Sequence, residues 1–478
     1  MITKIIKRLL HKSDIKTAKI ITKHNINVQH ISANALYVVS ELQKAGFKAF
    51  VVGGAVRDLL LEITPKDFDI ATDATPNQVC KIFRKARIIG KRFQIVLVPF
   101  YRSREQEIIE ITTFRAKLKE DSVVLIKDQS QRPKVSKGVQ VSQNSSNKVA
   151  MDSSGQVWND NVWGTHEEDA SRRDFTVNAL YYNPIDNKLY DFYDGIKDIS
   201  KQTLRIIGDP ATRYKEDPVR MLRLARFMAK TDFILEKSAL APIKEHAILL
   251  GNIPPARLSD ELLKMLMGGY ARACIKNLVK LGLDKHILPW YKVQSKLSQD
   301  FIELVLRRTD ERLEEGKSVS ASFIFASIYW PQLEQIWQKL QPHHPYVESL
   351  DLAIAQVIAP LQLQRKTVAD MQEIWHLQPR LEKRQKASIM KILEHPRFRA
   401  GYDFLVLRSM IDKNLEPLAQ WWTMIQELDE EQQQKEIDKL VIPRSSSRGR
   451  KPHRRRTRSS SSSSSSSASN TENKTKAE

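Results

Sequence analysis

FVVGGAVRDLLLEITPKDFDIAT, residues 50–72, is the stretch that decides the fold. Its apolar start ends at the pair Gly53-Gly54, and a helix is predicted directly after that pair. A second β-like segment carries Asp67 and Asp69, which are two residues apart and therefore project to the same side of an extended strand. The stretch predicts a strand, a glycine turn, a helix and a second strand.

These residues have the chemistry of a phosphate and metal site. Two neighbouring carboxylates, Asp67 and Asp69, repel each other unless a cation lies between them, and Mg²⁺ prefers such oxygen ligands. Backbone N–H groups at Gly53 and Gly54 can approach a phosphate closely, and Arg57 could contact a phosphate oxygen. Each feature alone is weak, since an isolated D-x-D is more often a solvated strand edge. Their joint order favours phosphoryl or nucleotidyl transfer, without the Lys-Ser/Thr of a Walker loop.

Further strands and helices are predicted on both sides of this stretch. Residues 31–45 have helical spacing between a Ser32 cap and Gly46, and a helix is predicted from Thr75-Pro76 to Lys85. Strands are predicted over 87–100 and 107–114. The head of the chain is therefore predicted to be mixed α/β with a small sheet.

The rest of the chain changes character twice. Residues 117 to about 157 are rich in Ser, Asn, Gln and Lys, which predicts a flexible loop, and after Ile206 the pattern is helical almost throughout. We therefore expect an α/β head with a small mixed sheet, an all-α neck and body, and a disordered basic tail. The predicted bounds are 1–30 for a loose basic N-terminal arm, 31–195 for the head, 196–268 for the neck, 269–440 for the body and 441–478 for the tail.

Charge and cysteine content narrow the class of partner and compartment. The formal net charge of +21 predicts a polyanionic partner, most often nucleic acid and less often an anionic membrane. The two cysteines, Cys80 and Cys274, are far apart, which fits a reducing, cytoplasmic compartment and argues against a zinc site. No apolar run approaches the roughly 20 residues that a bilayer requires. A transit peptide is the alternative for the basic start.

The motifs resemble those of a known family. GGAVRDLLL followed by KDFDIAT is similar to the signature of the class II nucleotidyltransferase family that contains the tRNA CCA-adding enzymes and the bacterial poly(A) polymerases. RRDFTVNAL at 172–180, EDPVRMLRLARF at 216–227 and RLSDE at 257–261 resemble further family elements in the same order. The resemblance covers about 30 to 265, over half the chain, and implies a nucleotidyltransferase head.

The resemblance implies roles for the residues of the head. Asp67 and Asp69 would bind two Mg²⁺ ions for an in-line displacement at a nucleotide. Asp174 is the expected further catalytic carboxylate, and Glu110, on a neighbouring strand, competes as the third carboxylate. Arg173 would contact phosphate or ribose. Without the resemblance, an ion pair of Arg173 with Glu167, Glu168 or Asp169 is the simpler interpretation.

The neck is implied to recognise the base. Asp217 and Arg220 are three residues apart on a predicted helix and so lie on one face, where a carboxylate and a guanidinium can bind a base edge without a template. Arg223 would lie close to them. The alternative is structural: Asp217 caps its helix and Arg220 pairs with it.

Three features favour the poly(A) polymerase branch over the CCA-adding branch. IIGKRFQIVLV at 88–98 resembles the stretch that distinguishes the polymerases, and IWHLQPRLEKR with HPRFRAGYDFL resembles their helical body. The arginine-rich end also resembles theirs and would bind RNA phosphates without sequence preference. A nonspecific charged end is the alternative. The tail residues are Arg448, Arg450, Lys451, Arg454, Arg455, Arg456 and Arg458.

The expected activity is template-independent addition of AMP from ATP to RNA 3′ ends, with two Mg²⁺ ions and release of pyrophosphate, in RNA polyadenylation and decay. RNA-decay proteins are expected partners, and the chain is expected to be monomeric. Addition of CCA to tRNA is the first alternative, and a non-catalytic RNA-binding protein is the second. A metal-dependent phosphohydrolase would need His-Asp pairs, which the 11 histidines do not form in the sequence.

Overall fold

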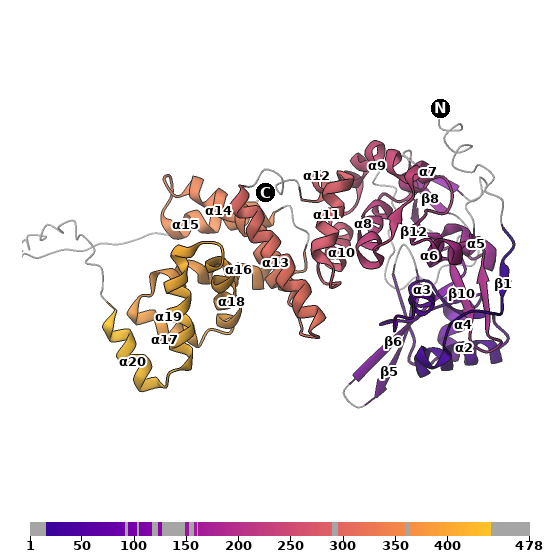
Figure 1. Ribbon diagram of the computed structural model, residues 1–478, viewed down its shortest axis with the longest axis horizontal. Coiled ribbons are helices and arrows are strands. Elements are labelled where there is room, and N and C mark those ends of the chain that lie inside the picture. Colours follow the sequence, from indigo (N-terminus) through magenta and orange to yellow (C-terminus); the bar gives the residue numbers. More distant parts are fainter. Residues whose placement is uncertain are drawn as a thin grey trace, which may run out of the picture.

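A computed structural model describes most of the chain between residues 16 and 440. Figure 1 shows an elongated molecule with the strands and early helices at one end and the helices after residue 295 at the other. No helix in the described ranges is both long and apolar enough to cross a membrane. These ranges are 16–90, 94–102, 105–116, 123–126, 149–152, 157–159, 161–288, 295–359 and 363–440.

The head is organised on one mixed sheet. The strand order is β1-β11-β10-β2-β3-β6-β5-β4, and only β3 and β6 run parallel. The central β2 and β3 come from the stretch 50–72, as predicted. The bounds are β1 Lys19–Ile21, β2 Ala49–Val52, β3 Asp69–Thr72, β4 Arg87–Ile89, β5 Ile95–Arg102, β6 Glu105–Thr113, β10 Leu180–Asn183 and β11 Lys188–Asp191.

Side chains alternate between the two faces of this sheet. Val51 and Ile70 belong to the large apolar core on one face, whereas Phe50, Val52 and Ala71 belong to a smaller cluster on the other. This alternation is the period-2 pattern of strands buried on both faces. The smaller cluster faces the same side as Asp69, because residues two apart on β3 share a face.

The helices of the head begin where the sequence predicts. Ser32 accepts hydrogen bonds from the N–H groups of Asn34 and Ala35 at the start of α2, and Thr75 and Gln78 form a capping box at α4. Gly46 has a positive φ of 90°, which suits a residue just beyond a helix end. The bounds are α2 Ala33–Lys44, α3 Gly54–Leu60, α4 Pro76–Ile82, α5 His166–Arg172 and α6 Gly195–Ser200.

Three predictions about the head are wrong in part. The N-terminal arm is not loose throughout 1–30, because Lys19–Ile21 pairs with β11. The strand predicted over 87–100 is two antiparallel strands, and Gly90 between them has a φ of 85°, which allows the chain to turn. The segment 117–157 contains strands β7 Val123–Ile126 and β8 Val149–Asp152, which join β9 Val157–Asn159 in a separate sheet. The other residues of that loop lie outside the described ones.

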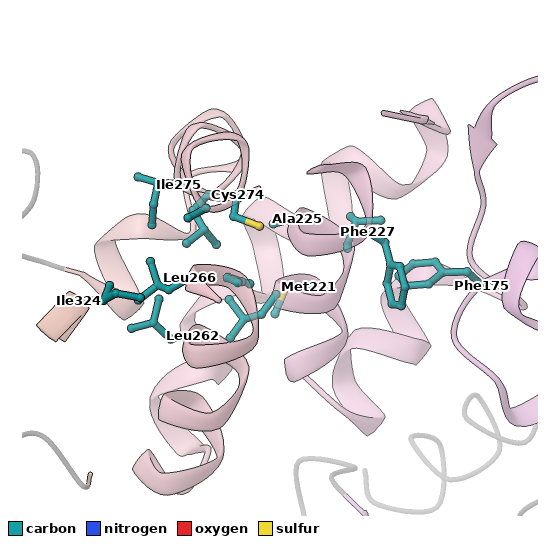
Figure 2. Close-up of a cluster of buried hydrophobic side chains, with 14 of the residues drawn as sticks. Phe175, Met221, Ala225, Phe227, Leu262, Leu266, Cys274, Ile275 and Ile324 are labelled. Atoms are coloured by element: carbon teal, nitrogen blue, oxygen red, sulfur yellow. The ribbon is translucent and has the colours of Figure 1, made fainter. Parts of the chain in front are cut away.

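The neck follows as a group of helices around a small parallel pair of strands. Its helices share the large apolar core, and Figure 2 shows Phe227 facing Phe175 of the head, with 5.4 Å between the ring centroids. At the other side Leu266 and Ile324 belong to the same cluster, so the core continues toward the body. The bounds are β12 Thr203–Leu204, α7 Pro210–Glu216, α8 Val219–Thr231, β13 Ile234–Leu235, α9 Leu240–His246, α10 Pro255–Leu266, α11 Ala271–Leu281 and α12 Asp284–Ile287.

The described part of the body is helical, as predicted. Its C-terminal helices surround a second core that includes the buried Trp422 and Leu381. The predicted RNA-binding tail lies outside the described residues. The helix bounds are α13 Lys296–Glu314, α14 Ala321–Leu340, α15 Tyr346–Ile358, α16 Arg365–Lys383, α17 Lys386–Leu393, α18 Phe398–Ser409, α19 Glu416–Glu427 and α20 Glu430–Lys439.

Candidate active site

The strand register places two predicted carboxylates side by side. Asp69 opens β3 and lies opposite Glu110 of the parallel strand β6, and both side chains are exposed. Asp67 precedes β3 and is also exposed. The sheet therefore presents a carboxylate pair at Asp69 and Glu110, with Asp67 two residues before the strand.

The electrostatics of Asp69 fit a cation-binding carboxylate. The pKa of Asp69 is raised to about 6, first by its partial burial in the surrounding protein and then by the negative charges of Glu110 and Asp67. Arg173 and Arg223 act in the opposite direction. No salt bridge to Asp69 is formed among the described residues. The described residues contain no group of three or more His, Cys, Asp or Glu that is already arranged around a metal position. The donor set is nevertheless the hard oxygen type that Mg²⁺ prefers.

The glycine turn brings a guanidinium close to Asp69. Gly53 has a φ of 77°, which side chains rarely adopt. A Cβ at this position would lie 3.6 Å from Nη1 of Arg173 and 3.9 Å from Oδ2 of Asp69. The backbone at Gly53 is thus close to both charged groups, which is the arrangement expected for binding a phosphate next to a metal.

Arg57 has a different position from the one that a phosphate contact requires. Its side chain is fully buried, donates from Nε and Nη2 to Oδ1 of Asp58, and donates from Nη1 to Oδ1 of Asn178 at 2.6 Å. Asp58 also accepts from Nζ of Lys230 in α8 at 3.0 Å. Arg57 therefore supports the glycine turn from below and, through Asp58, links the head to Lys230 of the neck. Its fully buried guanidinium does not fit the predicted phosphate contact.

Asp174 is paired with a cation of the neck. Its buried carboxylate accepts from Nε of Arg223 at 2.7 Å and from the N–H of Phe175 at 2.8 Å. Burial alone would raise its pKa, but Arg223 keeps the pKa of Asp174 below its ordinary value. The geometry therefore favours Glu110 over Asp174 as the third carboxylate next to Asp69, and it connects both Asp174 and Arg223 to the joint between head and neck.

The predicted base-recognition residues lie together at the α7–α8 junction. Asp217 accepts two hydrogen bonds from Arg257, at 2.8 and 2.7 Å, and Arg220 donates to Glu216 at 2.8 Å. The structure thus pairs Asp217 with Arg257 and Arg220 with Glu216. Pro218 rather than Asp217 occupies the N-cap of α8, although Oδ1 of Asp217 accepts from the N–H two residues later.

Some residues that organise the site were missed from the sequence. Asn178 binds Arg57, and Tyr181 binds both Arg173 and Asp169. No spacing rule identifies such contacts, because they form between residues from different strands and helices. The RLSDE motif gave a usable signal for α10, since Arg257 binds Asp217 and Glu261 binds Arg226 at 2.6 Å.

Three protein-family models match successive parts of the chain. Residues 49–205 match the poly A polymerase head domain. Residues 232–294 match the probable RNA and SrmB-binding site of polymerase A, and 338–460 match the polymerase A arginine-rich C-terminus. The matches thus extend from the head into the tail.

Relatives that align over most of this chain are named poly(A) polymerase I. Poly(A) polymerase I of Haemophilus influenzae is 40% identical over 448 residues, which cover 90% of this chain and 91% of the relative. Poly(A) polymerase I of Escherichia coli O157:H7 is 38% identical, with 86% and 88% covered. The CCA-adding enzyme of Bacillus licheniformis is 33% identical, but the alignment covers only 54% of this chain and 56% of that enzyme.

Solved structures confirm the fold. A CCA-adding enzyme in its apo form II has a TM-score of 0.56 at 19% identity, with 90% of this chain and 92% of that chain covered. The Bacillus stearothermophilus CCA-adding enzyme in complex with CTP has a TM-score of 0.50 at 22% identity, with 87% and 89% covered. Identities this low show the nucleotidyltransferase fold alone, whereas the full-length relatives identify the branch. The chain belongs to the poly(A) polymerase family of nucleotidyltransferases.

Proposed function

We propose that this enzyme adds AMP from ATP to RNA 3′ ends without a template and releases pyrophosphate. The observation that carries the proposal is the length of the match: relatives named poly(A) polymerase I align over 86–90% of the chain, including the helical body. The CCA-adding relative aligns over 54%. A shared head supports the common chemistry, and a shared body supports the polymerase product.

Asp67 and Asp69, with Glu110 as the proposed third carboxylate, would bind two Mg²⁺ ions. Such ions would lower the pKa of the attacking 3′-hydroxyl and neutralise charge on the triphosphate. The raised pKa of Asp69 and its position beside Glu110 support this role, because a cation would relieve the repulsion between the carboxylates. Asp174 is then a structural partner of Arg223 and not a metal ligand.

The chain's own cations and backbone would orient the nucleotide. The N–H groups of Gly53 and Gly54 and the Nη1 of Arg173 would contact phosphate oxygens, since Arg173 lies next to the glycine turn. Asp217 and Arg220 would contact the base edge. Arg257 binds Asp217 and Glu216 binds Arg220, which supports a base contact whose polar groups are held in place by the protein itself.

RNA would be bound by the neck, the body and the basic tail. The match of 232–294 to a probable RNA-binding family and of 338–460 to the arginine-rich C-terminus supports this assignment. Contacts of Lys and Arg with phosphate carry little sequence preference, which suits a growing homopolymer. We further propose a monomeric cytoplasmic enzyme that acts with RNA-decay proteins.

The test incubates the purified chain with Mg²⁺, an unstructured RNA and each nucleoside triphosphate separately. We expect long extension with ATP and little with CTP, GTP or UTP. Addition of at most three residues, confined to tRNA and dependent on CTP and ATP, would establish CCA addition instead. Absence of any extension, with RNA binding retained, would establish the non-catalytic alternative.

A further inference from the structure

Four residues that lie directly opposite one another on neighbouring strands form one row across the sheet at the proposed phosphate site. Tyr181 of β10 lies opposite Val52 of β2, Val52 lies opposite Asp69 of β3, and Asp69 lies opposite Glu110 of β6. Residues directly opposite on neighbouring strands face the same side of a sheet. The row therefore places the Tyr181 ring on the same face as the proposed metal ligands, two strands away from Asp69.

The Tyr181 hydroxyl connects two charged groups above this row. It donates to Oδ2 of Asp169 at 2.6 Å and accepts from Nε of Arg173 at 2.7 Å. Arg173 also donates to the same Asp169 oxygen, from Nη2 at 3.1 Å and from Nε at 3.3 Å. Its guanidinium carbon lies 4.9 Å from the centre of the Tyr181 ring. One edge of the guanidinium is thus bound by the protein.

The opposite edge of that guanidinium faces the glycine turn. Nη1 of Arg173 would be 3.6 Å from a Cβ at Gly53, and Oδ2 of Asp69 would be 3.9 Å from the same point. Because the guanidinium is planar, binding at Nε and Nη2 determines where Nη1 points. The side chain of Arg173 is about one-fifth exposed, so Nη1 can still meet a ligand.

We infer that Tyr181, together with Asp169, is a positioning residue that directs Nη1 of Arg173 toward the triphosphate of the incoming nucleotide. The inference rests on the proposed function, because it assigns the phosphate contact to Arg173. Tyr181 itself is fully buried. It therefore acts through Arg173.

The Tyr181 hydroxyl gives the Arg173 guanidinium a second point of attachment besides Asp169. Nε and Nη2 share one oxygen of Asp169, and the other oxygen of Asp169 accepts from the N–H of Arg115. With the hydroxyl absent, Nε loses its shorter hydrogen bond, at 2.7 Å, and the guanidinium can turn about its contact with Asp169 so that Nη1 moves away from Gly53. Burial raises the pKa of the Tyr181 hydroxyl well above its ordinary value, so the hydroxyl keeps its proton and continues to donate to Asp169. The alignment of Arg173 is therefore stable over the working pH range.

The neighbouring tyrosine provides a matched control. Tyr182 follows Tyr181 on β10, lies opposite Val51, and faces the other side of the sheet. Its hydroxyl donates to Oδ1 of Asn187 at 2.6 Å. Tyr182→Phe therefore removes an equivalent hydroxyl from the same strand without touching Arg173.

The experiment compares Tyr181→Phe and Tyr182→Phe in the full-length enzyme. For Tyr181→Phe we expect KM for ATP to rise about tenfold, the loss of one charge-assisted hydrogen bond, with adenosine affinity unchanged. For Tyr182→Phe we expect both quantities to remain at the wild-type value. Equal KM values for ATP in wild type and Tyr181→Phe would overturn the inference.

A double-mutant cycle separates positioning from a general loss of structure. If Tyr181 acts through Arg173, Arg173→Lys combined with Tyr181→Phe will be no worse than Arg173→Lys alone. Independent, additive losses, or an equal loss of adenosine binding, would overturn the inference even if Tyr181→Phe lowers Tm. A wild-type enzyme without ATP-dependent extension would instead refute the proposed function, so the two failures are distinguishable.

Discussion

The carboxylates of the head and those of the neck have opposite surroundings. Asp67, Asp69 and Glu110 are exposed and form no ion pair among the described residues, and the pKa of Asp69 is raised. At the joint with the neck, Asp174 and Glu216 are buried, each is bound by arginine, and the pKa of each is lowered. Among the described residues, arginine therefore pairs with the carboxylates at the joint but not with those at the sheet.

This difference separates catalysis from support. A bound cation relieves the repulsion between neighbouring carboxylates, whereas paired buried carboxylates keep neighbouring segments in register. The comparison therefore supports the proposed metal binding at the sheet and a structural role for the paired carboxylates at the joint with the neck. It also predicts that the same substitution, carboxylate to amide, has different consequences in the two places.

The largest expected effect is on activity at the sheet. Replacing Asp67 and Asp69 by Ala should reduce AMP addition by at least about a thousand-fold, because charge stabilisation by bound metal contributes several kcal/mol to the barrier. Folding should be unimpaired, since the change removes repulsion. Extension of RNA measured with excess Mg²⁺, beside a thermal unfolding curve, tests both statements.

Retention of extension in this double variant would show that the carboxylates do not bind the catalytic metal. RNA binding, measured separately by electrophoretic mobility, is the control for an intact neck and body. We expect it to remain at the wild-type value.

The second prediction decides between Glu110 and Asp174 as the third carboxylate. Glu110→Gln should lower the rate about a hundred-fold without lowering the free energy of unfolding, because Glu110 lies beside Asp69, is exposed and repels it. Asp174→Asn should lower the free energy of unfolding by about 2 kcal/mol, because it leaves Arg223 without its carboxylate. Urea unfolding and extension rates are measured for both variants.

The reverse result would identify Asp174 as the third carboxylate. In that case Asp174→Asn would be stable but inactive, and Glu110→Gln would remain active. Glu107 of the same strand binds Asn34 and not Asp69, so Glu107→Gln is the control for a general effect of charge on β6.

A smaller effect is expected on base selection in the neck. Arg257→Met removes both hydrogen bonds to Asp217, so we expect discrimination between ATP and CTP to fall about tenfold while the rate with saturating ATP changes little. Single-nucleotide addition with each triphosphate measures the ratio. An unchanged ratio would contradict a role of this pair in base selection.

Lys230→Met is the matched control for Arg257→Met. It removes another ion pair of the neck, to Asp58 at 3.0 Å, at a distance from the α7–α8 junction. If both variants relax discrimination equally, general loosening of the neck and not the Asp217 contact determines base choice.

Much of the fold could be predicted because its signals are local. Ser32 and Gly46 bound α2, and the alternation around Val51 gives β2. The motif order also identified the family. Two features were missed for different reasons. The pairing of Lys19–Ile21 with β11 depends on a strand about 170 residues later, whereas β7 carries the apolar run Val123–Ile126, which the polar composition of 117–157 as a whole obscures.

At the candidate site the residue types could be predicted but their partners could not. Asp69 was identified from its spacing to Asp67. The sequence predicts a phosphate contact for Arg57 as well, because a sequence does not show that its guanidinium is buried against Asp58 and Asn178. Asp169 was one of three acids considered for Arg173, and only the fold selects it, together with Tyr181.

The smallest predicted effect is the pH dependence of the metal-free head. Because the pKa of Asp69 is raised to about 6, protonation favours the fold: this contribution to stability is present below pH 4 and is lost as pH rises through 6. Asn at position 69 does not titrate. Between pH 4.5 and 7.5 the free energy of unfolding of the wild type should therefore fall by about 1 kcal/mol relative to Asp69→Asn, a small value because the carboxylate is exposed. Urea unfolding in EDTA measures the difference at each pH. Mg²⁺ should restore the free energy of unfolding of the wild type at pH 7.5, because it binds the ionised carboxylates. If the difference in free energy of unfolding between wild type and Asp69→Asn depends on neither pH nor Mg²⁺, the distinction between unpaired carboxylates at the sheet and paired ones at the joint does not hold.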